Sequence, residues 1–395
     1  MDILASSSHL DLAEILANDP TTFLFMSEHR KVRTSGAIAH ITARAEGGVD
    51  KDSPLQMAVA EAFQRARELG QKNPIVIGAI PFDVSQPSAL TVPEWYEFMP
   101  HMAVNTNQSV KLEPLTVSEY RYQPNHSDFK NMISEAVQRL KQGQLEKVVL
   151  SRILELDLSQ AVDCNAILQN LIVQNPAVYQ FRIPLGNNNT LIGASPELLV
   201  RKQKNSITTN PLAGTCKRMA DPQQDHLNAQ RLWQSTKDQH EHRLVIDTLR
   251  TQLSPLCDQL DIPAQPELIQ TSNLWHLSTR IQATLKEPAT NALQIACLLH
   301  PTPALCGSPA VTAKQLIDEL EPHDRGLFSG IVGWCDSEGN GEWAVTIRCG
   351  LVQAKRIRLF AGAGIVADSD PESEWQETGA KLGTMLNAFN IHNGE

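Results

Sequence analysis

The order of strand-like segments is the strongest constraint on how this 395-residue chain can fold. Short runs rich in β-branched and apolar residues follow one another through the C-terminal two-thirds, and the turn residues DSEGNGE separate two of them at hairpin distance. Strands that arrive in series, rather than alternating with helices, favour antiparallel sheets. The order therefore predicts an α+β fold with largely antiparallel sheets. The runs are EKVVLSRILELDL, VYQFRIPL, TLIGASPELLV, SITTNPLAGT, GIVGWC, WAVTIRCGLV and RIRLFAGAGIV.

Helical periodicity interrupts the strands in three places. One amphipathic helix is predicted to begin after an N-cap at Ser127. Two longer helices are predicted around 222–253 and 371–389, the second starting at Asp370 and Pro371. A polar, irregular stretch from the 90s to the 120s precedes all three and separates an N-terminal region from the better patterned remainder. The apolar face of the first helix consists of Phe129, Met132, Ile133, Ala136, Val137 and Leu140.

Charge and cysteine content exclude several classes of protein. Lysine plus arginine number 34 against 44 acidic residues, a net charge of −10, so nucleic acid and anionic membrane surfaces are not expected as partners. The seven cysteines are scattered without a CxxC pair, which indicates reduced thiols rather than disulfides or a zinc site. The N-terminal stretch MDILASSSHLDLAEILANDP does not read as a signal peptide, and the apolar runs are too short to span a bilayer. A cytoplasmic enzyme is expected.

Two of the predicted helices can each present two carboxylates on one face. Glu374, Glu377 and Lys381 are spaced i, i+3 and i+7, and Asp238 and Glu241 are spaced i, i+3. A solvated helix surface is one interpretation of the ExxExxxK pattern. The other is a site for a hard cation such as Mg²⁺, which takes one or two protein carboxylates and leaves positions for water and substrate oxygens.

Glycines and isolated polar residues in apolar segments supply further candidates. Gly362 and Gly364 lie between a strand and the last helix, where glycines allow a tight turn or a close approach of backbone N–H groups to an anion. Arg348 ends an otherwise apolar strand and needs a carboxylate, which a ligand could supply. His276 lies in an apolar setting, where a satisfied core histidine is the commoner outcome.

Lys147 and Glu197 are a candidate general base and general acid. Lys147 opens a strand, and Glu197 lies in the segment ASPELL. A lysine acts as a base only where burial or nearby cations lower its pKa, and a carboxylic acid donates a proton only where its pKa is raised. Ordinary surface residues are the alternative for both.

Taken together, these segments resemble the chorismate-utilising enzymes, a family that includes anthranilate, aminodeoxychorismate, isochorismate and salicylate synthases. The resemblance extends from about Ser127 to Leu386 and rests on the ordered motifs KVVLSR, IGASPELL, NPLAGT, KDQHEH, LHPTPALCGSP, RGLFSGIVGW, TIRCG, AGAGIV and SEWQETGAKL. It implies the fold of anthranilate synthase component I, with two large, mostly antiparallel sheets packed together and helices outside. It also implies one catalytic unit over residues 1–395, in which 1–125 complete the fold and 126–390 carry the chorismate-binding core motifs.

Variable positions within the family imply which reaction is catalysed. Ala213 stands where aminodeoxychorismate synthases carry a nucleophilic lysine, and Lys147 stands where anthranilate synthases usually carry glutamine, so the covalent and ammonia-using branches are not expected. Ala304 and Leu305 resemble the isochorismate synthases more than the salicylate synthases. The length and motifs resemble the siderophore-type enzyme that starts 2,3-dihydroxybenzoate synthesis. A menaquinone-pathway isochorismate synthase, a salicylate synthase and a non-catalytic chorismate-binding relative stay open.

The resemblance implies that chorismate becomes isochorismate by addition of water at C2 and loss of the C4 hydroxyl. Lys147 would activate the water and Glu197 would protonate the leaving hydroxyl. A monomer is expected, with an isochorismatase acting downstream. The substrate-binding residues would be Gly214, Thr215, His276, Ala304, Leu305, Arg348, Gly362, Gly364 and Lys381.

The same resemblance implies Mg²⁺ as the cofactor. Glu241 and Glu377 would bind the ion directly, and Asp238 and Glu374 would act through bound waters. The ion would bind the ring carboxylate of chorismate, while Arg348 would bind the enolpyruvyl carboxylate.

Overall fold

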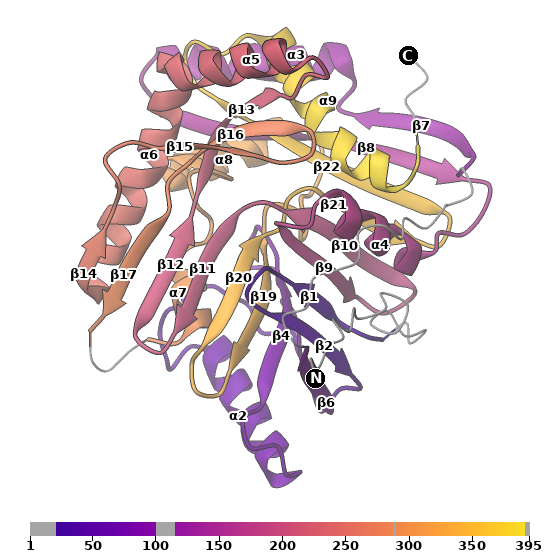
Figure 1. Ribbon diagram of the computed structural model, residues 1–395, viewed down its shortest axis with the longest axis vertical. Coiled ribbons are helices and arrows are strands. Elements are labelled where there is room, and N and C mark those ends of the chain that lie inside the picture. The colour runs from indigo at the N-terminus through magenta and orange to yellow at the C-terminus, as the bar shows by residue number, and fades with distance from the viewer. Residues whose placement is uncertain (1–20, 100–114, 287–289, 392–395) are drawn as a thin grey trace, which may run out of the picture.

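The computed structural model describes residues 21–99, 115–286 and 290–391. Within these ranges the strands form a ten-stranded sheet, a nine-stranded sheet and a small three-stranded sheet. Figure 1 shows the two large sheets packed together with the helices around them. The strand pairs in both large sheets are antiparallel, as in the pairing of β8 with β22 and of β19 with β20. The prediction of an α+β fold with two large antiparallel sheets is confirmed.

Strands from the N-terminal region continue both large sheets rather than forming a sheet of their own. The ten-stranded sheet runs in the order β18 (Gly307–Ser308), β8 (Lys147–Leu158), β22 (Arg356–Ile365), β21 (Cys349–Gln353), β10 (Asn189–Ser195), β9 (Tyr179–Pro184), β1 (Leu24–Met26), β2 (Lys31–Ser35) and β6 (Trp95–Met99), with β7 (Val117–Gln123) paired to β8. The nine-stranded sheet runs in the order β14 (Cys257–Asp261), β17 (Ile281–Leu285), β12 (Ser206–Asn210), β11 (Leu198–Gln203), β20 (Gly341–Val345), β19 (Ile331–Asp336), β4 (Ile75–Ile80), β5 (Ala89–Val92) and β3 (Ala39–Ile41). The small sheet runs β13 (Leu212–Lys217), β16 (Leu274–Ser278) and β15 (Glu267–Gln270).

A buried core lies between the two large sheets, and helices cover their outer faces. The core between the sheets includes Phe25, Ile77, Phe181, Trp334 and Phe360, each from a different strand. Buried residues of α2, α6 and α7 pack on the nine-stranded sheet, those of α4 and α9 on the ten-stranded sheet, and those of α3 and α8 on β8 and β22. The helices are α2 (Pro54–Glu68), α3 (His126–Lys141), α4 (Cys164–Gln174), α5 (Pro222–Gln234), α6 (Thr236–Leu253), the 3₁₀ helix η1 (Ser254–Leu256), α7 (Ala292–Leu299), α8 (Ala310–Leu320) and α9 (Pro371–Ala388).

The predicted helices are present, with two corrections to their ends. The N-cap of α3 is Asn125, whose side chain accepts a bond from Asp128 N, so the prediction of Ser127 as the cap was wrong. The apolar face predicted for that helix is buried. The single helix predicted around 222–253 is two helices, because Ser235 has an extended backbone and its side chain caps α6. Helix α9 begins after Asp370, as predicted.

Three of the predicted strands are each two strands that belong to different sheets. The run TLIGASPELLV forms β10 and β11 on either side of Pro196, and SITTNPLAGT forms β12 and β13 on either side of Pro211. The run WAVTIRCGLV forms β20 and β21, separated by a segment in which Arg348 has a positive φ of 47°. Proline lacks a ladder donor, and a positive φ turns the chain out of a strand. These crossings place Glu197 and Arg348 where the sheets meet.

The stretch from the 90s to the 120s is more regular than predicted. Strand β6 pairs with β2, and β7 pairs with β8 along much of its length, while residues 100–114 lie outside the described part. The prediction that the first 20 residues hold no signal peptide also falls outside the described residues. In the described part of the chain, no helix is both long enough and apolar enough to cross a membrane.

Candidate active site

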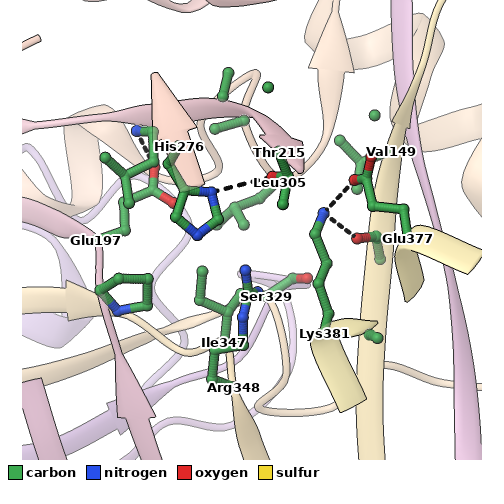
Figure 2. A pocket seen from close by; sticks show the side chains of 18 of the residues that line it. Val149, Glu197, Thr215, His276, Leu305, Ser329, Ile347, Arg348, Glu377 and Lys381 are labelled. Atoms are coloured by element: carbon green, nitrogen blue, oxygen red, sulfur yellow. Dashed lines mark hydrogen bonds and ion pairs between the residues drawn. The ribbon is translucent and has the colours of Figure 1, made fainter. Parts of the chain in front are cut away.

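A pocket lies where the chain crosses between the sheets. About 630 Å³ of space lies among its lining atoms and at its mouth, open solvent included. Figure 2 shows Glu197 and His276 on one side of this pocket and Glu377 and Lys381 on the opposite side. Of the residues predicted from sequence, Lys147, Asp238 and Glu374 lie outside the pocket lining. Those that line it are Glu197, Gly214, Thr215, Glu241, His276, Ala304, Leu305, Arg348, Gly362, Gly364, Glu377 and Lys381.

Lys147 and Glu241 form a buried ion pair at the wall of the pocket. Lys147 is fully buried at the start of β8, and its Nζ lies 2.8 Å from Oε1 of Glu241 on α6. Burial alone would raise the pKa of Glu241, but the neighbouring ammonium of Lys147 outweighs it and holds the pKa below its ordinary value. The predicted base and a predicted metal ligand are therefore direct partners.

Gly364 on β22 leaves the space that this ion pair occupies. A Cβ at Gly364 would lie 2.1 Å from Oε1 of Glu241 and 3.0 Å from Cε of Lys147. In strand β22 alternate residues share a face, so Gly362 and Gly364 face the pocket while Ala361 and Ala363 face the helices. A glycine is required at position 364 because the Glu241 carboxylate takes the place of a side chain.

Replacing Gly364 by alanine is expected to lower kcat/KM for the substrate by about 100-fold, because misplacing reactive groups by about 1 Å costs that much. The methyl group would push Glu241 away from its position beside Lys147. Steady-state kinetics and the melting temperature would be measured together. Gly383→Ala is the matched control, since a Cβ there meets no atom within 4 Å. Equal activity of the two variants would contradict this account of Gly364.

Helix α9 carries charged residues on the side of the pocket opposite Glu197 and His276 (Figure 2). Lys381 Nζ donates to Glu377 Oε1 at 2.6 Å and to the carbonyl oxygen of Gly362 at 2.8 Å, which ties the helix to β22. Glu374 is buried one turn earlier and accepts a bond from Lys237 Nζ at 2.7 Å. Burial and the nearby Glu377 raise the pKa of Glu374 to about 7. Sequence reasoning missed Lys237, although it directly precedes Asp238 in the motif KDQHEH.

The carboxylates of α6 and α9 have the chemistry of a hard-cation site. Burial, with a smaller contribution from the nearby Glu241, raises the pKa of Asp238 to about 6. Among the described residues no group of three His, Cys, Asp or Glu side chains is spaced to hold a metal unaided. Glu241 and Glu377 both line the pocket and fit an ion that takes two protein carboxylates and completes its shell with water and substrate.

The other side of the pocket holds an acid and a neutral imidazole. Burial raises the pKa of Glu197 to about 7, although the N–H of Leu212 donates to its Oε1 at 3.4 Å. Burial and the charge of Arg348 lower the pKa of His276 well below its ordinary value. His276 Nδ1 and Thr215 Oγ1 share a hydrogen bond of 3.1 Å, which fixes the ring. Glu197 can therefore carry a proton near neutral pH, whereas His276 is uncharged.

Arg348 supplies positive charge to the pocket from a strained backbone position. It is buried, and burial lowers the pKa of its guanidinium to about 10. Its φ of 47° and that of 59° at Ser329 are in the left-handed region, which L-residues other than glycine rarely adopt. Both residues line the pocket, and Figure 2 shows their side chains close together. Ser329 was missed from sequence, although it lies in the motif RGLFSG.

Comparisons with known proteins cover nearly the whole chain. The sequence model of the family described as chorismate binding enzyme matches residues 100–390. The chain is 46% identical over 375 residues to the isochorismate synthase EntC of Escherichia coli K12, which covers 94% of this chain and 96% of that protein. The crystal structure of a putative 2,3-dihydroxybenzoate-specific isochorismate synthase, DhbC from Bacillus anthracis, has a TM-score of 0.88 and 37% identity, and the match covers 96% of this chain and 100% of that one. Anthranilate synthase component I from Streptococcus pneumoniae shares the fold, with a TM-score of 0.71 at 21% identity over 98% of this chain and 99% of that one.

Proposed function

This chain belongs to the chorismate-binding enzymes, and from that premise we propose that it is an isochorismate synthase, which isomerises chorismate to isochorismate. The observation that carries the assignment is the 46% identity to an isochorismate synthase over 94% of the chain. The solved relative from Bacillus anthracis is named as specific for 2,3-dihydroxybenzoate. We therefore place the reaction in the synthesis of 2,3-dihydroxybenzoate, the unit of catecholate siderophores.

The reaction needs a base and an acid on opposite sides of the ring. A water oxygen forms a bond to C2, the ring double bond shifts, and the C4–oxygen bond breaks. The proton of the attacking water goes to the base, and the acid supplies a proton to the departing hydroxide, so water is released as water is consumed. In this proposal Lys147 is the base, acting as the neutral amine, and Glu197 is the acid. The pKa of Glu197 near 7 supports its role, because burial lets the carboxyl carry a proton near neutral pH.

Substrate binding requires positive charge in a pocket that is rich in carboxylates. Arg348 would hold the enolpyruvyl carboxylate by a two-pronged hydrogen bond. Lys381 lies near Glu377 and would add positive charge beside the ring carboxylate. Backbone groups at Gly214, Thr215, Gly362 and Gly364 would contact the substrate, and His276, Ala304 and Leu305 would limit the space around its reacting edge.

We propose Mg²⁺ as the cofactor of this site. Bound between Glu241 and Glu377, the ion would supply positive charge to the ring carboxylate and fix the ring for attack. Asp238 and Glu374 would orient water molecules of the ion's shell. Burial, with a contribution from the nearby charges of Glu241 and Glu377, raises the pKa of Asp238 and Glu374, and a divalent cation would offset the part that comes from those charges, which supports this proposal.

We further propose that residues 1–395 form a single catalytic unit that acts as a cytoplasmic monomer. The continuation of both large sheets by N-terminal strands supports the single unit. The acidic net charge of −10 agrees with the absence of nucleic-acid and membrane partners from this proposal. An isochorismatase is the enzyme class that would consume the product on the way to 2,3-dihydroxybenzoate.

Product analysis tests the function and the cofactor together. Purified protein with chorismate and Mg²⁺ is expected to form isochorismate, and full chelation is expected to lower the rate by at least about 100-fold until Mg²⁺ is restored. Chromatography would separate the products. Salicylate and pyruvate formed without a second enzyme would instead identify a salicylate synthase. Failure to turn over chorismate would favour a non-catalytic binding protein, and turnover that survives chelation would contradict the metal site.

A further inference from the structure

A buried ion pair lies directly behind the pocket, at the end of α8. Arg325 is 4% exposed and Glu321 is 9% exposed. The guanidinium Nε donates to Glu321 Oε2 at 2.8 Å, and Nη2 donates to Oε1 at 2.5 Å. The ring of Phe82 lies 4.4 Å from the guanidinium carbon and closes one face of it. The orientation of this guanidinium is therefore fixed by a two-pronged ion pair and an aromatic face.

The remaining donors of Arg325 reach two separate segments of the pocket wall. Nη1 donates to the carbonyl oxygen of Leu305 at 2.9 Å, and Nη2 donates to the carbonyl oxygen of Val149 at 2.6 Å. Leu305 and Val149 both line the pocket, and Val149 lies two residues beyond Lys147 on β8. One guanidinium thus adds to the backbone bond from Val149 N to the carbonyl oxygen of Cys306, at 2.8 Å, in joining the loop of Leu305 to the strand that carries the proposed base.

The same pair also contacts β8 at a second point, and a backbone bond closes the turn that follows Arg325. Glu321 Oε1 accepts bonds from the backbone N of Ser151 at 2.7 Å and from its Oγ at 2.9 Å. The backbone N of Phe328 donates to the carbonyl oxygen of Arg325 at 3.0 Å. Phe328 and its neighbour Ser329 line the pocket. Two wall segments that are distant in sequence, the loop of Leu305 and strand β8, therefore meet at the Arg325 side chain, next to the wall residues of its own turn.

These contacts depend on the shape of the arginine side chain. A guanidinium has five donors in a planar fork, whereas a lysine ammonium has three donors at one point and cannot span two carbonyls and a carboxylate. A buried ion pair is weak evidence for stability, because well-packed apolar residues often serve as well. A fork that reaches the backbone of two wall segments has a geometric role that apolar residues cannot supply.

We propose that Arg325, held by Glu321, is a positioning residue for the isomerisation. Together with the backbone bond between Val149 and Cys306, it sets the position of Leu305 relative to Val149. It thereby holds the reacting edge of chorismate in register with Lys147 and Glu197. Displacing reacting groups by about 1 Å lowers the reaction rate by about 100-fold. The inference rests on the proposed function, since it concerns the wall of that site.

A double-mutant cycle on the full chain with Mg²⁺ tests the proposal. R325K is expected to lower kcat/KM for chorismate by about 10- to 100-fold. If Arg325 acts through Leu305, the effect of R325K is expected to be at least about fivefold smaller when Leu305 is already alanine. The half-saturating Mg²⁺ concentration is expected to change by less than about twofold, because Arg325 contacts none of the carboxylates proposed to bind the ion.

Matched variants make the outcome decisive. R201K disturbs another pair with a buried carboxylate, since Arg201 Nε lies 2.7 Å from Glu342 Oε1, and neither residue lines this pocket. R201K is expected to change kcat/KM by the same factor with and without the L305A substitution. E321Q removes the negative charge that pairs with Arg325 while keeping the shape of the Glu321 side chain. Its effect on kcat/KM is expected to be smaller when Leu305 is already alanine, as for R325K. E321Q carries the test if R325K does not fold, as judged by circular dichroism.

Two results would overturn the proposal. One is a folded R325K or E321Q variant that loses the same factor in kcat/KM whether or not Leu305 is replaced by alanine. The other is a weakening of Mg²⁺ binding that parallels the loss of kcat/KM, which would indicate a general loosening of the structure. The parent protein separates the two levels of inference: if it does not convert chorismate, the proposed function itself fails, and if it does, only the role of Arg325 is in question.

Discussion

Replacing Lys147 by glutamine is expected to lower kcat for isochorismate formation by about 10³-fold, the loss typical of removing a general base. Glutamine keeps most of the length of the side chain and can still donate a hydrogen bond to Glu241, but its amide nitrogen cannot accept a proton from water. Product formation would be measured by chromatography at saturating chorismate and Mg²⁺. Lys147 is fully buried, so folding of the variant would be checked by circular dichroism.

Lys237→Gln is the matched control for Lys147→Gln. Lys237 also pairs with a buried glutamate of the same region, at 2.7 Å from Glu374 Oε1, but it does not line the pocket. Loss of its charge perturbs the same group of carboxylates without removing the proposed base. We expect its effect on kcat to remain within about tenfold. Near-parental isochorismate formation by the Lys147 variant, or an equal loss in both variants, would exclude Lys147 as the base.

The fold class could be predicted from sequence because strands in series leave few alternatives to antiparallel sheets. Helices α3 and α9 could be predicted because one side of each is apolar at helical spacing and their starts carry cap residues. Helices α4 and α7 were not predicted, and their sequences CNAILQNLIVQ and ALQIACLL show the reason. Both segments are short and largely apolar, and periodicity cannot distinguish such a run from a buried strand.

The crossings between sheets could not be predicted, and they determine the site. In TLIGASPELLV and WAVTIRCGLV the apolar pattern continues through the crossing, because the residues on both sides are buried in one or other sheet. The local pattern therefore shows one strand where there are two. Glu197 and Arg348 are recognisable as unusual polar residues in apolar surroundings, but only the crossing explains why both side chains reach one pocket.

The pairing of Lys147 with Glu241 was also inaccessible from sequence. Strand β8 and helix α6 are far apart in the chain, and the spacing of residues within each element gives no information about contacts between them. Sequence reasoning treated the base and the metal ligand as independent predictions. Because the two groups are 2.8 Å apart, a change at either one alters the charge around the other. Kinetic effects of substitutions at these positions are therefore expected to be non-additive.

Replacing Glu197 by glutamine is expected to lower kcat by about 10²- to 10⁴-fold and to remove the alkaline limb of the pH profile. Glutamine can still accept the hydrogen bond from Leu212 N, so the backbone contact at the crossing is kept while the acidic proton is lost. Burial raises the pKa of Glu197 to about 7. The carboxyl is therefore protonated, and able to donate, below about pH 7, and it loses its proton as the pH rises above that value.

The parental kcat should accordingly fall by about tenfold for each pH unit above the pKa of Glu197, measured from about pH 5 to about pH 9. Glu342→Gln is a suitable control, because Glu342 is also a buried carboxylate but lies outside this pocket, and that variant should keep the alkaline limb. An alkaline limb of unchanged position in the Glu197 variant would show that another group donates the proton. In that case the raised pKa of Glu197 would be only a consequence of its burial where the chain crosses between the sheets, and it would have no role in the reaction.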